Sequence, residues 1–196
     1  MAAWTEMTDE QLIRALQEGR RDAFDVIVDR YSGQLNNFIY RIVGDAATAE
    51  DLLQETFIRL WTNRHSYREI AKFSTWLYTV AGNLAKSELR RKRIRRFVSL
   101  SSGGERSLDG EEERTFELSD ESADPEGDYQ RRFINKRVEE EIKKLPILFK
   151  EVIILRDIQE LSYEEIGSIL KIPLGTVKSR VNRARQRLQT KLQDLR

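Results

Sequence analysis

Residues 162–188 read SYEEIGSILKIPLGTVKSRVNRARQRL, and they say more about the fold than any other part of the chain. Ser162 can accept a hydrogen bond from the backbone three residues on, and Glu165 can reach back, which forms a capping box at a helix start. Apolar residues at helical spacing follow. Pro173 then ends this helix, because proline disfavours helical geometry in the residue before it. The pattern predicts two short helices joined by a tight turn.

The second of these helices, from about Leu174, has a narrow apolar face and a polar face rich in arginine. Arginine and amide side chains suit hydrogen bonding to base edges, and cations suit phosphates. We therefore predict a helix-turn-helix whose second helix reads a DNA major groove. A solvated surface helix is the alternative, which the capping box and the proline-bearing turn make less favoured. The predicted DNA-facing residues are Thr176, Lys178, Ser179, Asn182, Arg183 and Arg187.

Composition limits the chemistry that the chain can perform. It has 196 residues, 34% of them charged, with no cysteine and with His65 as its one histidine. Disulfides and thiolate metal sites are thereby excluded, and histidine-based catalysis has little to work with. No apolar run approaches the ~18 residues of a membrane span, and the N-terminus lacks a secretory signal. We expect a cytoplasmic protein with no membrane insertion, no cofactor and no metal.

The net charge of +1 hides an uneven distribution. Residues 1–97 carry a net +3, residues 98–128 a net −9 and residues 129–196 a net +7. The acidic stretch has few large apolar residues and cannot bury enough surface to offset its ordering entropy. We predict an all-α protein in which two small helical domains, 1–97 and 129–196, are joined by a flexible acidic linker. Two interpretations of this linker stay open: it is only a spacer, or its negative charge has a function.

Apolar spacing predicts six helices besides the helix-turn-helix, and no segment shows sustained strand alternation. Their approximate ranges are 8–18, 22–43, 47–62, 74–95, 129–144 and 146–158. The helix 47–62 has an acidic outer face that also carries an isoleucine. Its members are Asp51, Gln54, Glu55 and Ile58. Such a face suits a protein partner that presents arginines, although a solvated face is an equal alternative.

Residues 73–96, FSTWLYTVAGNLAKSELRRKRIRR, combine aromatic side chains with a basic tail. Aromatic rings can stack on unpaired bases, and the cations can neutralise phosphates. The polar loop before them, 63–72, could hold an extruded base. The alternative is that Trp76 and its apolar neighbours are simply core. The residues predicted to meet melted DNA are Tyr67, Lys72, Phe73, Trp76, Lys86, Arg90, Arg91 and Arg93.

Three stretches, AEDLLQETFIRLW (49–61), residues 73–96 and residues 162–188, together resemble the extracytoplasmic-function (ECF) subfamily of bacterial RNA polymerase sigma factors, with sigma-W-like and RpoE-like members. The resemblance implies a chain that binds core RNA polymerase and directs it to promoters. It makes residues 1–97 region two, which docks on the clamp coiled coil and reads and melts the minus-ten element. It makes residues 129–196 region four, which contacts the flap and reads the minus-thirty-five element.

The resemblance also implies roles for single residues. Asp51, Gln54 and Glu55 match polymerase-docking positions, and Asn83 matches a position that contacts a non-template-strand base. The positions that match the recognition helix are Lys178, Ser179, Asn182 and Arg183. Family members are often held inactive by an anti-sigma factor, so we expect one as a partner. The family linker threads through the polymerase cleft, which would give the acidic stretch a role.

Two other classes of function compete with this interpretation. A stand-alone helix-turn-helix regulator would use the same DNA-reading helix, but a response regulator would also need a β/α receiver domain, of which the sequence has no sign. An enzyme could be argued from the carboxylates near Glu55, yet no Glu-x-x-His partner accompanies them. We therefore expect a non-enzymatic protein.

Overall fold

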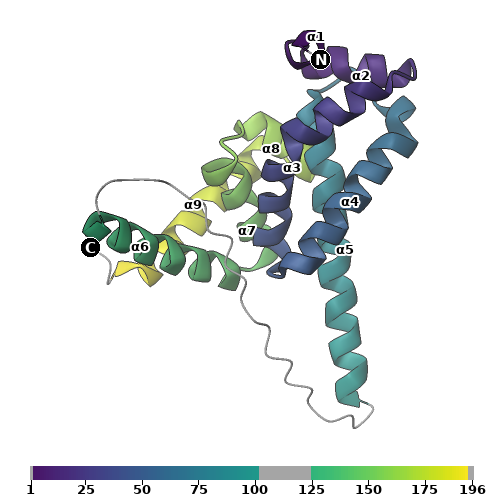
Figure 1. Cartoon of the computed structure of the whole chain (residues 1–196). Helices are drawn as coiled ribbons and strands as arrows, with labels where there is room; N and C mark the ends of the chain where they lie inside the picture. The colour runs from purple at the N-terminus through teal and green to yellow at the C-terminus, as the bar shows by residue number, and fades with distance from the viewer. Residues whose placement is uncertain (1, 102–124, 194–196) are drawn as a thin grey trace.

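The computed structural model describes residues 2–101 and 125–193, and every regular element within these residues is a helix (Figure 1). The all-α prediction is confirmed. The N-terminal half contains α1 (Ala2–Thr5), α2 (Asp9–Gln17), α3 (Arg21–Val43), α4 (Ala46–Asn63), the short 3-10 helix η1 (Arg64–Ser66) and α5 (Phe73–Ser101). The C-terminal half contains α6 (Pro125–Lys144), α7 (Ile147–Ile153), the π-helical turn η2 (Ile154–Ile158), α8 (Tyr163–Leu170) and α9 (Leu174–Lys191).

Local signals set the helix boundaries in the N-terminal half. Thr8 and Gln11 form the capping box that begins α2. Gly44 ends α3 at a φ of 79°, a left-handed conformation that glycine adopts without strain. Asp45 then begins α4, because its carboxylate accepts a hydrogen bond of 2.8 Å from the backbone N–H of Thr48.

The core of the N-terminal half lies between α3, α4 and α5, which run side by side in Figure 1. Ile27, Leu35 and Phe38 of α3 are fully buried there. Aromatic side chains pack edge to face across the helices, with the ring of Phe24 lying 5.3 Å from that of Trp61. The last turns of α5 project beyond this bundle, so its basic end stands clear of α4 (Figure 1).

The C-terminal half is built around α7 and η2. Val152, Ile153 and Leu155 are buried, and α9 packs along α7. The π-helical turn is held by Arg156, whose guanidinium donates a hydrogen bond of 2.8 Å to the carbonyl of Leu161. Together with the buried packing of α7, this contact positions α8 and α9 on the rest of the half.

The two halves also pack on each other, which the sequence did not lead us to expect. The α5 helix contacts α8, and α3 contacts α6, α7 and η2. Buried side chains of both halves belong to one continuous hydrophobic cluster. The acidic linker predicted for residues 98–128 falls mostly outside the described residues; α5 continues to Ser101 and α6 begins at Pro125.

Candidate nucleic-acid interface

The helix-turn-helix has the predicted local structure. The carboxylate of Glu165 accepts a hydrogen bond of 2.8 Å from the backbone N–H of Ser162, and the Ser162 hydroxyl accepts one of 3.2 Å from Glu165. Lys171 ends α8 at a φ of 55°, in the left-handed region. The turn passes close to α8, because a Cβ on Gly167 would lie 3.1 Å from the carbonyl oxygen of Ile172. A side chain at residue 167 would push the turn away.

The α9 helix separates an apolar face from a polar one. Val177, Val181 and Ala184 are fully buried against the rest of the half. Most of the predicted DNA-facing residues are exposed on the other side: Lys178, Ser179, Asn182, Arg183 and Arg187. Thr176 is half-buried, and its carbonyl accepts a hydrogen bond of 3.0 Å from the Ser179 hydroxyl. The exposed polar face is therefore free to enter a groove.

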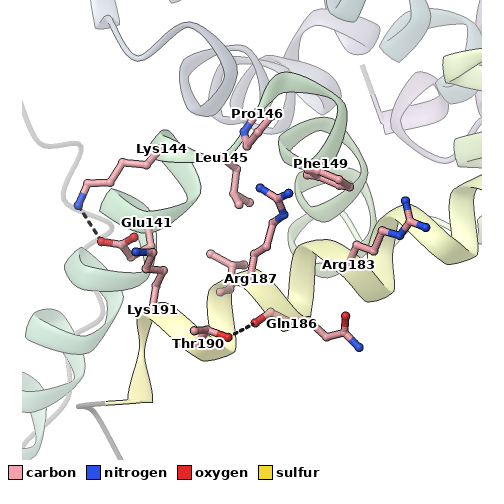
Figure 2. A pocket seen from close by; sticks show the side chains of 11 residues that line it. Glu141, Lys144, Leu145, Pro146, Phe149, Arg183, Gln186, Arg187, Thr190 and Lys191 are labelled. Atoms are coloured by element: carbon pink, nitrogen blue, oxygen red, sulfur yellow. Dashed lines mark hydrogen bonds and ion pairs between the residues drawn. The ribbon is translucent and has the colours of Figure 1, made fainter.

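Arg187 differs from the other predicted DNA-facing residues in its surroundings. Its guanidinium lies 4.7 Å from the centre of the Phe149 ring, a cation–π contact. Figure 2 shows it reaching toward Leu145 and Phe149, whereas Gln186 extends away from them. A groove of about 560 Å³ lies here, between α9 and the junction of α6 and α7. Arg187 thus points along the base of the helix-turn-helix, not from the outer face of α9.

The aromatic side chains of the loop and of the start of α5 lie largely in the core. For Tyr67 and Phe73 this differs from the prediction that they contact melted DNA. Phe73 is fully buried and Tyr67 nearly so. The Tyr67 hydroxyl donates a hydrogen bond of 2.9 Å to the carbonyl of Ala71, and the Tyr67 ring packs 5.6 Å from that of Phe73. Trp76 is half-buried and stacks on Phe73. These rings fold the loop back onto α5, so Phe73 and Tyr67 do not present faces to solvent.

The loop before α5 has a further anchor that sequence reasoning missed. The side-chain amide of Gln17 donates hydrogen bonds of 2.7 Å and 3.2 Å to the carbonyls of Arg64 and Tyr67. Arg14 forms an ion pair with Glu69 in the same loop. Nothing in the local sequence marks Gln17 for this task, because it stands at the end of an ordinary amphipathic helix.

The predicted basic contacts of α5 fall into two groups. Arg90, Arg91 and Arg93 are exposed on its projecting end, where Arg91 also lies 3.9 Å from the carboxylate of Glu88. Asn83 is exposed nearer the middle. Together these side chains form a polar, mostly cationic strip that can follow a phosphate backbone.

Lys72 and Lys86 instead face carboxylates of the C-terminal half. The Lys72 ammonium lies 2.8 Å from Glu165, and this hydrogen bond raises the pKa of the lysine. The Lys86 ammonium lies 3.3 Å from Glu151. Burial raises the pKa of the Glu151 carboxyl, because the loss of water outweighs the attraction of Lys86.

The predicted polymerase-docking residues share one exposed side of α4. Asp51, Gln54 and Ile58 are exposed, and the isoleucine retains 58% of its accessible surface. Glu55 accepts a hydrogen bond of 2.7 Å from Arg59 one turn later. Thr56 and Leu60 lie on the opposite, fully buried side. Together the four residues Asp51, Gln54, Glu55 and Ile58, here called the α4 face, make an acidic surface with an apolar residue at its C-terminal end.

Each half of the chain matches a known protein family. The family Sigma-70 region 2 matches residues 27–95, and the family Sigma-70, region 4 matches residues 135–188. The ECF RNA polymerase sigma factor SigW of Bacillus subtilis is 36% identical over 190 residues, which cover 97% of this chain and all of that one. This chain belongs to the ECF family of RNA polymerase sigma factors. The RNA polymerase sigma-H factor of Pseudomonas aeruginosa is 34% identical and covers 97% of each chain.

Solved structures share the fold of this chain. The sigma factor RpoE from Bartonella quintana, crystallised in complex with the anti-sigma factor NepR, matches with a TM-score of 0.67 and 25% identity over 87% of this chain and 96% of that one. CnrH, in complex with the cytosolic domain of CnrY, shares the fold with the same TM-score at 20% identity.

Membership of the family decides between the classes of function left open by the sequence. This ECF sigma factor is a transcription initiation factor that directs promoter-specific transcription, not an enzyme and not a stand-alone regulator. In the described residues, no helix has the length and apolar content needed to cross a bilayer, and no three metal-ligating side chains come together.

Proposed function

We propose that this ECF sigma factor divides promoter recognition between its two exposed nucleic-acid surfaces and docks on core RNA polymerase through the α4 face. The observation that carries the proposal is the clean separation of faces on α9. Its apolar side is fully buried, while Lys178, Ser179, Asn182 and Arg183 are exposed together. A helix held in this way can enter a major groove without exposing its core.

Arg183 is the strongest candidate for reading the minus-thirty-five element. A guanidinium can make two hydrogen bonds to a guanine, and Asn182 beside it can pair with an adenine. Thr176 and Lys178 lie nearer the start of α9, where phosphates of a bound duplex would pass. Arg187, which stacks on Phe149, keeps α9 in place and contributes charge near the duplex.

In the N-terminal half, we assign the minus-ten element to the exposed strip on α5. Asn83 supplies hydrogen bonds to a base, and Arg90, Arg91 and Arg93 supply charge for the phosphates. The buried rings of Tyr67 and Phe73 support the loop that precedes α5, and the half-buried Trp76 is the aromatic side chain of this region that is left for stacking on a base.

The α4 face fits a polymerase surface that presents arginines. Its carboxylates attract such a partner, and the exposed Ile58 supplies apolar surface that interfaces commonly bury. The clamp coiled coil of core polymerase is the proposed partner. An anti-sigma factor is a further proposed partner, since the structurally similar RpoE was crystallised with one.

Replacing Asp51 by Arg tests the docking proposal. A cation in the α4 face would repel the arginines of the partner, so we expect the affinity of the full chain for core polymerase to fall at least about tenfold. Native gels of core polymerase with the purified chain measure it. Asp22→Arg on α3 is the matched control for the charge change. Equal affinity of the Asp51→Arg variant and the control would overturn the assignment of the α4 face.

A further inference from the structure

The ion pairs between the two halves all have the same polarity. Three such pairs occur in the described part of the chain: Lys72 to Glu165 at 2.8 Å, Lys86 to Glu151 at 3.3 Å and Arg41 to Glu139 at 2.8 Å. In each of these pairs the cation belongs to the N-terminal half and the carboxylate to the C-terminal half. In these three ion pairs, the C-terminal half supplies the negative charge that an anionic ligand would supply to the same cations.

The contact is more than a set of surface charges. The Tyr78 hydroxyl donates a hydrogen bond of 2.5 Å to the side-chain oxygen of Gln159. The tyrosine is 2% exposed, and its ring packs edge to face on Phe38 at 5.2 Å. Lys143 lies 5.5 Å from the centre of the Tyr40 ring. A partly buried hydrogen bond and continuous apolar packing stabilise the pairing of the halves.

Two of the ion pairs occupy residues that are candidates for DNA contact. Lys72 precedes α5 and Lys86 lies between Asn83 and the basic end of that helix. An ammonium whose charge is already compensated by a carboxylate attracts a phosphate less strongly. Glu165 and Glu151 thus stand where the phosphates of a bound strand would compete for the same cations.

We propose that this contact between the halves is an autoinhibitory interface of the free chain, in which carboxylates of the C-terminal half compete with DNA for Lys72 and Lys86. The proposal rests on the function proposed above, because it assumes that the same cations meet the minus-ten strand. It assigns to the C-terminal half a second task besides DNA reading.

The distance between the two promoter elements is a reason to expect that the two halves separate on DNA. Their names place them about 25 base pairs apart, roughly 85 Å at 3.4 Å per pair. A compact chain of this length has a radius of gyration of about 16 Å, so the closed form cannot reach both elements. Covalent geometry allows the chain between Ser101 and Pro125 to span roughly 80 Å at most. Binding both elements therefore requires the halves to separate.

Arg41 and Glu139 allow the interface to be tested without altering any proposed DNA or polymerase contact. Glu139→Arg places two cations opposite each other and should open the interface. The charge swap Arg41→Glu/Glu139→Arg restores an ion pair and should close it again. Glu140→Arg is the matched control. Glu140 is the next residue after Glu139, but it pairs within α6, with Arg137 at 3.8 Å, and not across the interface. Circular dichroism checks that each variant keeps its helices.

The separation of the halves can be measured directly in the full chain. It contains no cysteine, so spin labels on cysteines introduced at the exposed residues Ala47 and Ser168 report a single distance. We expect one narrow, short distance in the wild type, the control and the swap, and a longer, broader distribution in Glu139→Arg. A long distribution in the wild type, or no change in Glu139→Arg, would overturn the proposal.

Binding of a fluorescent single-stranded DNA of mixed sequence tests the inhibition. Glu139→Arg and Glu140→Arg add the same charge, so their comparison removes the general electrostatic effect. We expect Glu139→Arg to bind at least about fivefold more tightly than Glu140→Arg, because the competent open form becomes populated. Equal affinity, together with the longer distance, would refute autoinhibition. If the distances respond as expected but no variant supports transcription with core polymerase, the proposed function fails while the closed interface stands.

Discussion

Single side chains on α9 carry different tasks although they look alike in the sequence. Arg183 and Arg185 are both exposed, but Arg185 is bound by Asp157 through two hydrogen bonds, of 3.1 Å and 2.5 Å. That pair fixes α9 to the π-helical turn η2. Arg183 has no such role, and it is available for a base edge. The difference between them follows from which side of α9 each occupies.

Arg183→Ala should therefore reduce discrimination between promoter sequences by about 1–3 kcal/mol, because it removes a bidentate contact to one base. Competition binding of the full chain with core polymerase to matched and single-substituted upstream elements measures this. Arg185→Ala is the control, and we expect it to leave discrimination unchanged. A uniform loss of affinity for all sequences in Arg183→Ala would show that Arg183 contacts only phosphate.

Glu165 links the helix-turn-helix to the N-terminal half. Partial burial alone would raise the pKa of its carboxyl, but hydrogen bonds from Lys72 and from Ser162 lower it below the ordinary value. A lowered folded-state pKa stabilises the fold above the unfolded pKa of about 4.3, and this stability is lost as the pH falls through the folded pKa.

We therefore expect acid to weaken the wild type more steeply than a Glu165→Gln variant below about pH 4.3. Urea unfolding followed by circular dichroism at several pH values measures the difference. The amide of glutamine keeps an acceptor for the Ser162 N–H but does not titrate. Parallel pH dependence of the two proteins would contradict the role assigned to the ionised carboxylate.

The helical elements follow local rules closely, and these rules explain what the sequence could predict. The capping boxes at Thr8 and Ser162 and the stop at Gly44 place helix ends within the chain where they were expected. Periodicity could not say which aromatic residues near α5 are buried. Gln17, which binds the Tyr67 carbonyl, and Tyr31, whose ring packs 5.9 Å from that of Phe73, both lie far away in sequence. Long-range contacts of this kind leave no local pattern.

The close approach of α8 to its turn gives an element-level prediction. Gly167→Val should destabilise the fold by about 1–3 kcal/mol, because the added side chain meets the Ile172 carbonyl and Val177. Gly33→Val in α3 is the matched control, since a Cβ there meets nothing within 4 Å. Thermal unfolding of both variants measures the difference. Equal stability would mean that the turn can move without cost.

The molecule as a whole consists of two helical halves that pack on each other. We propose that each half reads one promoter element and that the α4 face docks on core polymerase. Sequence patterns predicted the helices of each half, because these helices are set by local signals such as capping boxes and glycine stops. They could not predict the interface between the halves, since residues such as Tyr78 and Gln159 carry no mark of being partners. The autoinhibition proposed above requires two arrangements of the same helices.

Transcription by bacterial core RNA polymerase on a library of genomic fragments, with and without the full chain, tests the central claim most directly. We predict that the chain produces new transcripts whose start sites share two upstream elements at a fixed spacing, and that Asp51→Arg abolishes them. Sequencing of the transcript ends measures both. No increase in transcripts over core polymerase alone, from a chain that still binds DNA, would contradict the account.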